Sequence, residues 1–227
     1  MRISVVLPIY NEEAVLKKSL QDVMKKMKQI VSTFEILAVD DGSVDTTSVI
    51  LKNFKEKYKN FSIITHTKNK GYGAVIKSGV KHAKYEWIFF TDADLQFDVL
   101  ELKKFLPFAK KNEFVIGFRK RRAEGARRRI ISHTYNRIIR MLFGFSIKDV
   151  DCAFKLMKKS SLQKIRLQSN SFFVSCELMV KAAKKKYAIK ELPVQHYKRA
   201  KGESKVTMTK VIKTISDLFS LYKTISL

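Results

Sequence analysis

Hydrophobic residues in the first half of the chain alternate between short runs and helix-spaced patterns. β-Branched and aromatic residues gather in runs at 3–7, 35–39, 62–65, 87–90 and 114–117. Between the first two runs, apolar residues recur every three or four positions, a spacing typical of a helix that packs on a sheet. These residues are Leu16, Leu20, Val23, Met27 and Val31. With further helices predicted over 46–57, 73–83 and 99–110, the pattern indicates βαβ units and an α/β fold with a mainly parallel sheet.

The pattern changes after Arg119, where the chain becomes basic and amphipathic. In segment 130–145, one helical face carries Ile131, Tyr135, Ile138 and Leu142. Packing of this face on the protein core and contact with a membrane surface are equally compatible with the sequence. Segment 206–227 has a second amphipathic pattern, for which we favour a membrane interface or a partner. We therefore divide the chain into a main domain over 1–205 and a C-terminal amphipathic helix over 206–227.

The composition is strongly basic. Lys and Arg number 46 against 21 Asp and Glu, and the formal net charge of +25 indicates an anionic partner: a phosphorylated compound, an anionic lipid surface or a nucleic acid. The 45% hydrophobic content suffices for one substantial core. Cys152 and Cys176 lie in apolar sequence and are too few for a disulfide framework, which fits a reducing compartment.

No segment approaches the roughly 20 apolar residues that a membrane-spanning helix needs. The apolar run at the N-terminus meets Pro8 and Asn11 too soon for a signal peptide. We therefore expect a cytoplasmic protein whose membrane contact is peripheral.

Polar residues follow most of the predicted strands. The first strand runs into PIYNEE, the second into DDGSVDTT, the fourth into TDADLQFD and the fifth into FRKRR. Because open α/β sheets bind ligands at the carboxyl ends of their strands, these residues predict a binding site. Asp40 and Asp41 are suited to accept hydrogen bonds from a nucleobase or ribose, and Gly42 permits the tight turn that exposes them. For Asp45, capping of the following helix is the preferred interpretation.

An acidic motif follows the fourth strand directly. Asp92, Ala93 and Asp94 are joined two residues later by Gln96. Carboxylate and amide oxygens at this spacing suit Mg²⁺ or Mn²⁺, which keep coordination positions for water or substrate phosphates. Such an ion neutralises a diphosphate leaving group as its bond to a sugar breaks. The motif therefore predicts a divalent metal site.

Six motifs occur in order along nearly the whole chain. They are PIYNEE at 8–13, VDDGSVDTT at 39–47, GYGAVIKSG at 71–79, TDADLQFD at 91–98, DVDCAFKL at 149–156 and RAKGESKV at 199–206. Together they resemble family 2 glycosyltransferases of the GT-A fold and, more narrowly, the dolichyl-phosphate mannose synthase group of polyprenyl-phosphate sugar transferases. The resemblance implies a Rossmann-like, mainly parallel sheet flanked by helices, with C-terminal amphipathic helices.

The resemblance implies roles for individual residues on the donor side. Nucleotide contacts are implied for Pro8, Tyr10, Glu12, Val39 and Asp41. The donor diphosphate is implied at Asp92, Ala93, Asp94 and Gln96, of which Asp92, Asp94 and Gln96 are the metal ligands. Basic residues of a loop that closes over the donor are implied at Lys201 and Lys205. The narrower group has an arginine in place of Lys201, so a bidentate phosphate contact becomes a point charge and Arg199 is a candidate substitute.

On the acceptor side, Arg119 resembles an arginine placed at the reacting phosphates and also contacts the donor. Arg128 and Ser132 align with residues that hold the acceptor phosphate, so the implied catalytic set is Asp94, Arg119, Arg128 and Ser132. A phosphate acceptor is largely a dianion at neutral pH and needs orientation rather than a general base. The resemblance thus implies inverting transfer of mannose or glucose, from GDP-mannose or UDP-glucose, to polyprenyl or dolichyl phosphate at the cytoplasmic membrane face. A separate membrane-anchor subunit is compatible with this reading.

Two other functions remain open. A transferase that glycosylates a sugar hydroxyl needs a base, and Glu177 is placed for one, although a helix-surface carboxylate explains it equally well. DVDCAFKL lacks the proline and the serine-glycine of the mannose synthases, so donor sugar and base stay open. A nucleic-acid-binding protein accounts for the charge, but it gives no reason for TDADLQ at a strand end. We therefore expect no nucleic acid partner.

Overall fold

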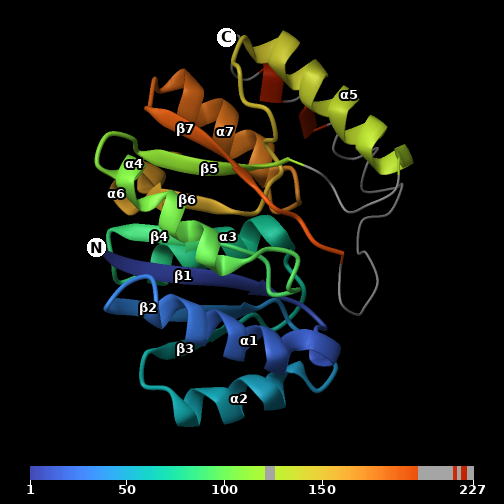
Figure 1. Cartoon of the computed structure of the whole chain (residues 1–227). Helices are drawn as coiled ribbons and strands as arrows, with labels where there is room; N and C mark the ends of the chain where they lie inside the picture. Colours follow the sequence, from blue (N-terminus) through green and yellow to red (C-terminus); the bar gives the residue numbers. More distant parts are fainter. Residues whose placement is uncertain (121–125, 199–216, 219–220, 224–227) are drawn as a thin grey trace.

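A seven-stranded sheet forms the centre of the protein (Figure 1). The computed structural model describes residues 1–120, 126–198, 217–218 and 221–223, with the backbone alone for 126–131. The strands are β1 (Arg2–Ile9), β2 (Thr33–Asp40), β3 (Phe61–Thr65), β4 (Trp87–Phe90), β5 (Phe114–Arg119), β6 (Lys155–Lys158) and β7 (Ile189–Val194). Their order across the sheet is β3-β2-β1-β4-β6-β5-β7, and β6 runs antiparallel to both of its neighbours.

The strand order creates a ligand-binding edge beside β1. From β1 the sheet continues to β2 and β3 on one side and to β4 on the other, the kind of switch in order at which open α/β sheets bind ligands. The parallel register sets Ile9 beside Asp40 and Val6 beside Phe90. The loops that follow β1, β2 and β4 therefore leave the sheet at the same edge.

Helices cover both faces of the sheet, and each layer encloses its own hydrophobic core (Figure 1). One layer comprises α1 (Glu13–Lys28), α2 (Thr47–Lys57), the 3₁₀ helix η1 (Val99–Lys104) and α4 (Leu106–Ala109). The other comprises α3 (Tyr72–His82), α5 (Ala126–Phe143), α6 (Lys159–Gln163) and α7 (Val174–Lys184). The helix-spaced apolar residues of α1 are buried in the first core, as their spacing predicts.

The α/β fold with a mainly parallel sheet confirms the prediction, and the five predicted strands are all present. The sequence did not reveal β6 or β7. β6 is only four residues long, and β7 contains Pro193, a residue that sheets accept on an edge strand such as this one. The helix predicted over 99–110 is divided into η1 and α4, because Pro107 at the start of α4 has no N–H to continue the first helix.

Each of the two amphipathic segments packs some of its described apolar side chains on the second core. In α5, Ile139 is fully buried and Tyr135 packs partly buried against the second core, whereas Ile138 and Met141 are exposed. Ile131 lies outside the described side chains. In the C-terminal segment, Leu218 and Leu221 are buried in the second core. Within the described part of the chain, no helix is both long and apolar enough to span a bilayer.

Candidate active site

Strained backbone gathers at the carboxyl edge of the sheet. Asn11 follows β1 with φ of 48°, and Leu95 follows β4 with φ of 63°, both in the left-handed region that side chains disfavour. Such conformations persist where the surrounding structure imposes them, and they are commonest at functional sites. The strain at Leu95 lies between Asp94 and Gln96, inside the predicted metal motif.

The loops after β1 and β2 are joined by hydrogen bonds. The Asn11 N–H donates to Ser43 Oγ at 2.9 Å, and the Glu12 N–H donates to Thr47 Oγ1 at 3.0 Å. Asp45 Oδ1 accepts from the Thr47 N–H at 3.0 Å, at the first residue of α2, whereas the N-cap position itself is Thr46. Burial alone would raise the pKa of Asp45, but the hydrogen bonds that its carboxylate accepts from Thr47 and Glu13 outweigh this effect and lower the pKa overall.

The residues with implied nucleotide contacts lie along this edge. Pro8, Tyr10 and Glu12 are half-buried, whereas the Val39 side chain is fully buried in the second core. Asp41 is also buried, and its carboxylate accepts hydrogen bonds from the loop that contains Gly71. The structure thus brings the five residues together but gives Val39 a packing role.

The acidic motif is tied to the chain segment after β7. Asp94 is 3% exposed, and its Oδ1 accepts from the Gln96 N–H at 3.0 Å. Gln96 Nε2 donates to the Tyr197 carbonyl at 3.1 Å, and the Tyr197 N–H returns a bond to the Gln96 carbonyl at 2.9 Å. Ala93 is buried beneath them. These bonds therefore hold Asp94 and Gln96 close to each other.

The acidic motif suits a cation that is shared with a substrate. No group of three or more His, Cys, Asp or Glu side chains in the described residues is arranged to hold a metal by itself. Asp92, Asp94 and the amide oxygen of Gln96 would supply oxygen ligands of the kind that Mg²⁺ prefers, and substrate phosphates would supply further ones. The residues present therefore fit a metal ion that binds together with a diphosphate.

Arg119, at the end of β5, forms a bidentate ion pair with Asp149. Its Nε and Nη2 atoms donate to the two carboxylate oxygens, each at 2.7 Å, and the side chains are 11% and 9% exposed. Burial alone would lower the pKa of Arg119, but the hydrogen bonds and charge of Asp149 raise it overall. Sequence reasoning assigned Arg119 to the reacting phosphates and missed Asp149. A bidentate pair of this kind holds the guanidinium close to the end of β5.

The start of α5 is connected to the same turn. Asn136 Nδ2 donates to the Ser132 carbonyl at 2.8 Å and to Ser132 Oγ at 3.3 Å, while Asn136 Oδ1 accepts from the Val150 N–H at 3.0 Å. Asn136 therefore links Ser132, one helical turn earlier in α5, to the turn that carries Asp149. Arg128 is described only by its backbone in α5, and Lys201 and Lys205 lie outside the described residues.

Glu177 is a buried anchor within α7. It is 1% exposed, and its oxygens accept from the N–H groups of Gln168 and Ser169 at 2.8 and 2.9 Å and from Lys181 Nζ at 2.5 Å. The interpretation as a helix-surface carboxylate is therefore wrong. These bonds fix the 168–170 segment, which lies against Gly71 and Gly73: a Cβ added at either glycine would come within 2.3 Å of a backbone oxygen of this segment.

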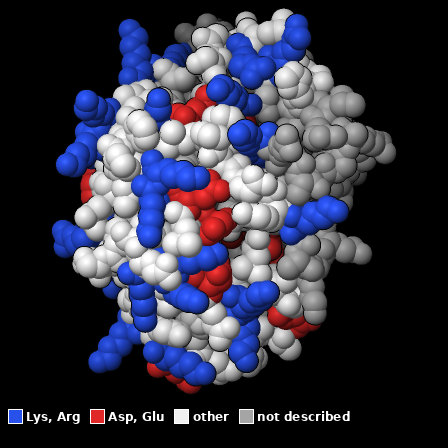
Figure 2. All heavy atoms as spheres, viewed as in Figure 1, with Lys and Arg blue, Asp and Glu red and all other residues white. Residues whose placement is uncertain are grey.

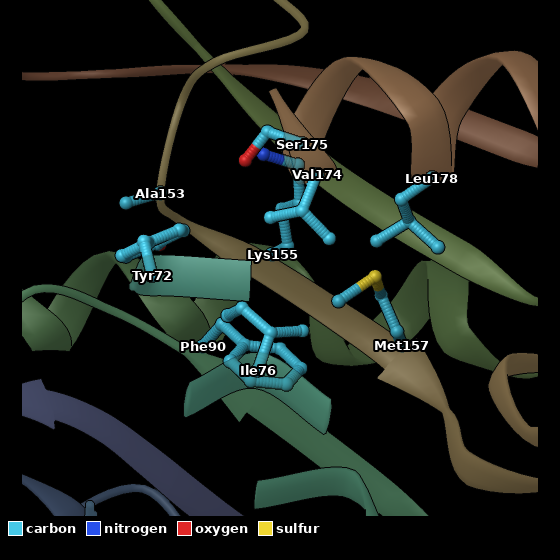
Figure 3. A pocket seen from close by; sticks show the side chains of 9 residues that line it. All are labelled: Tyr72, Ile76, Phe90, Ala153, Lys155, Met157, Val174, Ser175 and Leu178. Carbon is cyan, nitrogen blue, oxygen red and sulfur yellow. The ribbon is translucent and has the colours of Figure 1, made fainter. Parts of the chain in front are cut away.

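Lys155 and Tyr72 lie in two of the six motifs, but the sequence assigned no role to either residue. Figure 3 shows Lys155 of β6 pointing toward Ser175 of α7, at the end of a small cavity bordered by Tyr72 and Ala153. Lys155 is 3% exposed, and its Nζ donates to the Cys152 carbonyl. Burial lowers the pKa of Lys155, whereas burial, followed by the charge of Asp92, raises the pKa of Tyr72. In the sequence, the signal that pointed to Lys155 was a lysine within an apolar segment.

Basic residues are dispersed over the face shown in Figure 2, and acidic side chains gather near its middle. On this face the excess of Lys and Arg forms no single stripe of the kind that tracks a nucleic acid backbone. The distribution favours broad attraction to anionic molecules or surfaces.

The fold and the acidic loop at its edge define the GT-A class of α/β protein. Glucosyl-3-phosphoglycerate synthase from Mycobacterium tuberculosis, solved with phosphoglyceric acid, superposes with a TM-score of 0.72 at 17% identity, over 98% of this chain and 80% of the synthase. The same synthase with Mn²⁺, UDP and phosphoglyceric acid gives 0.71 at 16% identity, over 97% and 78%. At these identities the likeness establishes the fold alone.

Sequence comparison establishes the family. The model of glycosyl transferase family 2 matches residues 4–166, so the chain belongs to this family and is a glycosyltransferase. Dolichyl-phosphate beta-glucosyltransferase ALG5A of Trichomonas vaginalis is 31% identical over 96% of this chain and 72% of its own length. Undecaprenyl-phosphate 4-deoxy-4-formamido-L-arabinose transferase of Photorhabdus laumondii is 29% identical over 98% and 68%.

Proposed function

We propose that this glycosyltransferase moves a hexosyl group, glucose or mannose, from a nucleotide diphosphate sugar to the phosphate of a polyprenol or dolichol. The observation that carries the proposal is the buried Asp94 in its strained loop, at the sheet edge where the other donor-side residues meet. The two relatives named for polyprenyl-phosphate substrates support the acceptor class. Glucose is the sugar in the name of the more similar of the two.

A divalent cation, Mg²⁺ or Mn²⁺, belongs to this proposal. Asp92, Asp94 and Gln96 are the residues that would hold it, and bound there it would neutralise the charge of the departing diphosphate. The hydrogen bond from the Gln96 amide nitrogen to Tyr197 leaves the amide oxygen as the atom available to a cation. Mn²⁺ in the similarly folded glucosyl-3-phosphoglycerate synthase is consistent with this assignment.

The transfer step requires no proton acceptor. An oxygen of the acceptor phosphate attacks the anomeric carbon, a new carbon–oxygen bond forms, and the bond to the nucleotide diphosphate breaks with inversion. The phosphate dianion becomes a phosphodiester monoanion, and the nucleoside diphosphate carries away the electron pair. We assign the acceptor phosphate to Arg128 and Ser132 of α5 and to Arg119, whose guanidinium Asp149 holds at the end of β5.

Transfer to a sugar hydroxyl is the less supported alternative. It needs a carboxylate that is able to remove a proton, and Glu177 already accepts three hydrogen bonds from its own chain. To act as a base, Glu177 would first have to break its hydrogen bonds to the 168–170 segment. The phosphate acceptor makes no such demand.

A peripheral position at the cytoplasmic face of a membrane completes the proposal. The net charge of +25 attracts an anionic lipid surface, with about 1 kcal/mol for each basic residue close to it. The exposed Ile138 and Met141 of α5 provide apolar contacts beside the implied acceptor site. A separate membrane-anchor subunit is a further partner that this arrangement accommodates.

The test is a panel assay with purified chain, Mg²⁺ or Mn²⁺, radiolabelled UDP-glucose or GDP-mannose, and a polyprenyl phosphate. We expect label to partition into organic solvent in a metal-dependent manner, and the preferred donor identifies sugar and base. An Asp94→Asn variant serves as the inactive reference, with Asp22→Asn, in a surface ion pair, as the matched control. Label that appears only in water-soluble product would refute the lipid acceptor.

A further inference from the structure

Asp41 is held by donors from two parts of the chain. Its Oδ1 accepts from His66 Nδ1 at 2.7 Å and from the Lys70 N–H at 2.9 Å, while Oδ2 accepts from the Gly71 N–H at 2.8 Å. The Asp41 and His66 side chains are 5% and 7% exposed. Asp41 therefore connects the end of β2 to the loop that opens α3.

The hydrogen bond to Asp41 places a proton on Nδ1 of His66. An ionised carboxylate only accepts hydrogen bonds, so Nδ1 of His66 carries a proton. Nε2 lies 2.9 Å from Ser78 Oγ on α3 and, in the neutral ring, accepts from that hydroxyl. A continuous chain of hydrogen bonds thus runs from Ser78 through His66 to Asp41 and on to the loop amides.

The arrangement of Ser78, His66 and Asp41 matches the order of a hydrolytic triad, but it lacks the setting of one. An acyl-transfer nucleophile needs N–H donors directed at the developing oxyanion. Ser78 lies in the middle of α3, where the backbone N–H groups are used by the helix itself. The chain of hydrogen bonds therefore serves to orient Asp41.

A carboxylate has about four lone-pair sites, and three of those of Asp41 are filled by donors of the described chain. Asp40 pairs with Ile9 and the Asp41 N–H donates to the Ile9 carbonyl, so Asp41 lies at the edge where Tyr10 and Glu12 also leave the sheet. We propose that His66 is a positioning residue for donor recognition: it orients Asp41 so that its remaining oxygen site accepts from the base or ribose of a nucleoside diphosphate. This inference rests on the proposed use of a nucleotide sugar.

Two substitutions separate the two ring nitrogens. His66→Asn places an amide nitrogen near the position of Nδ1 and keeps the bond to Asp41. His66→Gln reaches toward the position of Nε2 and Ser78, and it leaves Asp41 without its side-chain donor. Because a hydrogen bond to a charged group is involved, we expect His66→Gln to weaken nucleoside diphosphate binding by about tenfold to a hundredfold. We expect His66→Asn to restore affinity to within about threefold of wild type, and Ser78→Ala to fall between them.

Calorimetric titration with UDP and with GDP measures these affinities, and thermal unfolding confirms that each variant is folded. If His66 had a merely structural role, its substitution would lower thermal stability, but the nucleotide affinities of the variants would not follow whether the bond to Asp41 is kept. In the transfer assay, the donor KM should rise in His66→Gln while the acceptor KM keeps its wild-type value.

The outcomes are distinguishable. Equal affinity of folded His66→Gln and wild type would overturn the inference and leave the proposed function intact. If His66→Gln does not fold, His66→Asn and Ser78→Ala decide: the inference falls if His66→Asn binds nucleotide more weakly than Ser78→Ala. A wild-type chain that binds neither nucleotide would overturn the proposed function, and this inference with it.

Discussion

Arg119 and Asp149 form a bidentate ion pair that joins the end of β5 to the turn before β6. Both side chains are about nine-tenths buried, so neither charge is satisfied by water. The position of the Arg119 guanidinium is therefore fixed by Asp149.

Asp149→Asn should destabilise the protein by about 3–5 kcal/mol, since it leaves the buried guanidinium without a counter-charge. Urea unfolding measures the change. The double variant Arg119→Met with Asp149→Asn should be less destabilised than the single Asp149 variant, because it also removes the buried guanidinium that has lost its bidentate carboxylate. Additive losses from the two substitutions would contradict a direct coupling.

Replacing Asp94 should abolish transfer while the fold is kept. Asp94→Ala removes a proposed metal ligand from a loop that keeps its hydrogen bonds between Gln96 and Tyr197. We expect the folded variant to lose Mn²⁺-dependent nucleotide binding, which calorimetry measures. Transfer near the wild-type rate would show that Asp94 holds no essential cation.

Glu177→Gln distinguishes an anchor from a base. As an anchor, Glu177 gives up one or two hydrogen bonds to the 168–170 segment, at a cost of about 1–3 kcal/mol in stability. Transfer to a polyprenyl phosphate should continue at a rate within about tenfold of wild type. If Glu177 were a catalytic base, Glu177→Gln would lower the transfer rate by about 10²–10⁴-fold and hardly alter the stability. The transfer rate and the stability therefore distinguish the two roles.

Gly71 and Gly144 form a matched pair for testing the close approach in the donor loop. Both have positive φ, 94° and 66°, so alanine introduces backbone strain at each. An added Cβ at Gly71 would lie 2.3 Å from the Asn170 carbonyl oxygen, whereas at Gly144 it meets nothing within 4 Å. Gly144→Ala should cost about 1 kcal/mol and leave transfer active. Gly71→Ala should cost more and impair donor binding; equal effects in thermal unfolding and donor KM would argue against the close approach.

The stability of the protein should fall at alkaline pH partly because of Cys152. Burial raises the pKa of its thiol to about 11, above the value of about 8.5 in an unfolded chain. The native state therefore keeps a proton that the unfolded state loses, and stability decreases as the pH rises through this window. The Cys152→Ala variant should show a shallower decrease, by up to about 1.4 kcal/mol per pH unit, in unfolding measured between pH 8.5 and 10.5. Parallel pH profiles would contradict the shift.

The sequence revealed the parts of this protein whose signal is local. The strands of the first half carry their own apolar runs, and each leads into a polar loop, so the binding edge and the acidic motif were both predictable. Asp149, His66 and the anchoring role of Glu177 were not, because each depends on a partner at least eight positions away. β6 was missed for the same reason: four residues become a strand only when β4 and β5 lie on either side.

The loop at 70–73 is gripped from two directions. Asp41 accepts from its amides on one side, and on the other the Gly73 N–H donates to the Asn170 carbonyl in the segment that Glu177 anchors. The first 120 residues therefore cannot be exchanged between family members independently of the remainder of the chain. A chimaera that takes its N-terminal half from a relative must also import that relative's counterpart of 168–177, or the grafted loop will meet a surface shaped for another sequence.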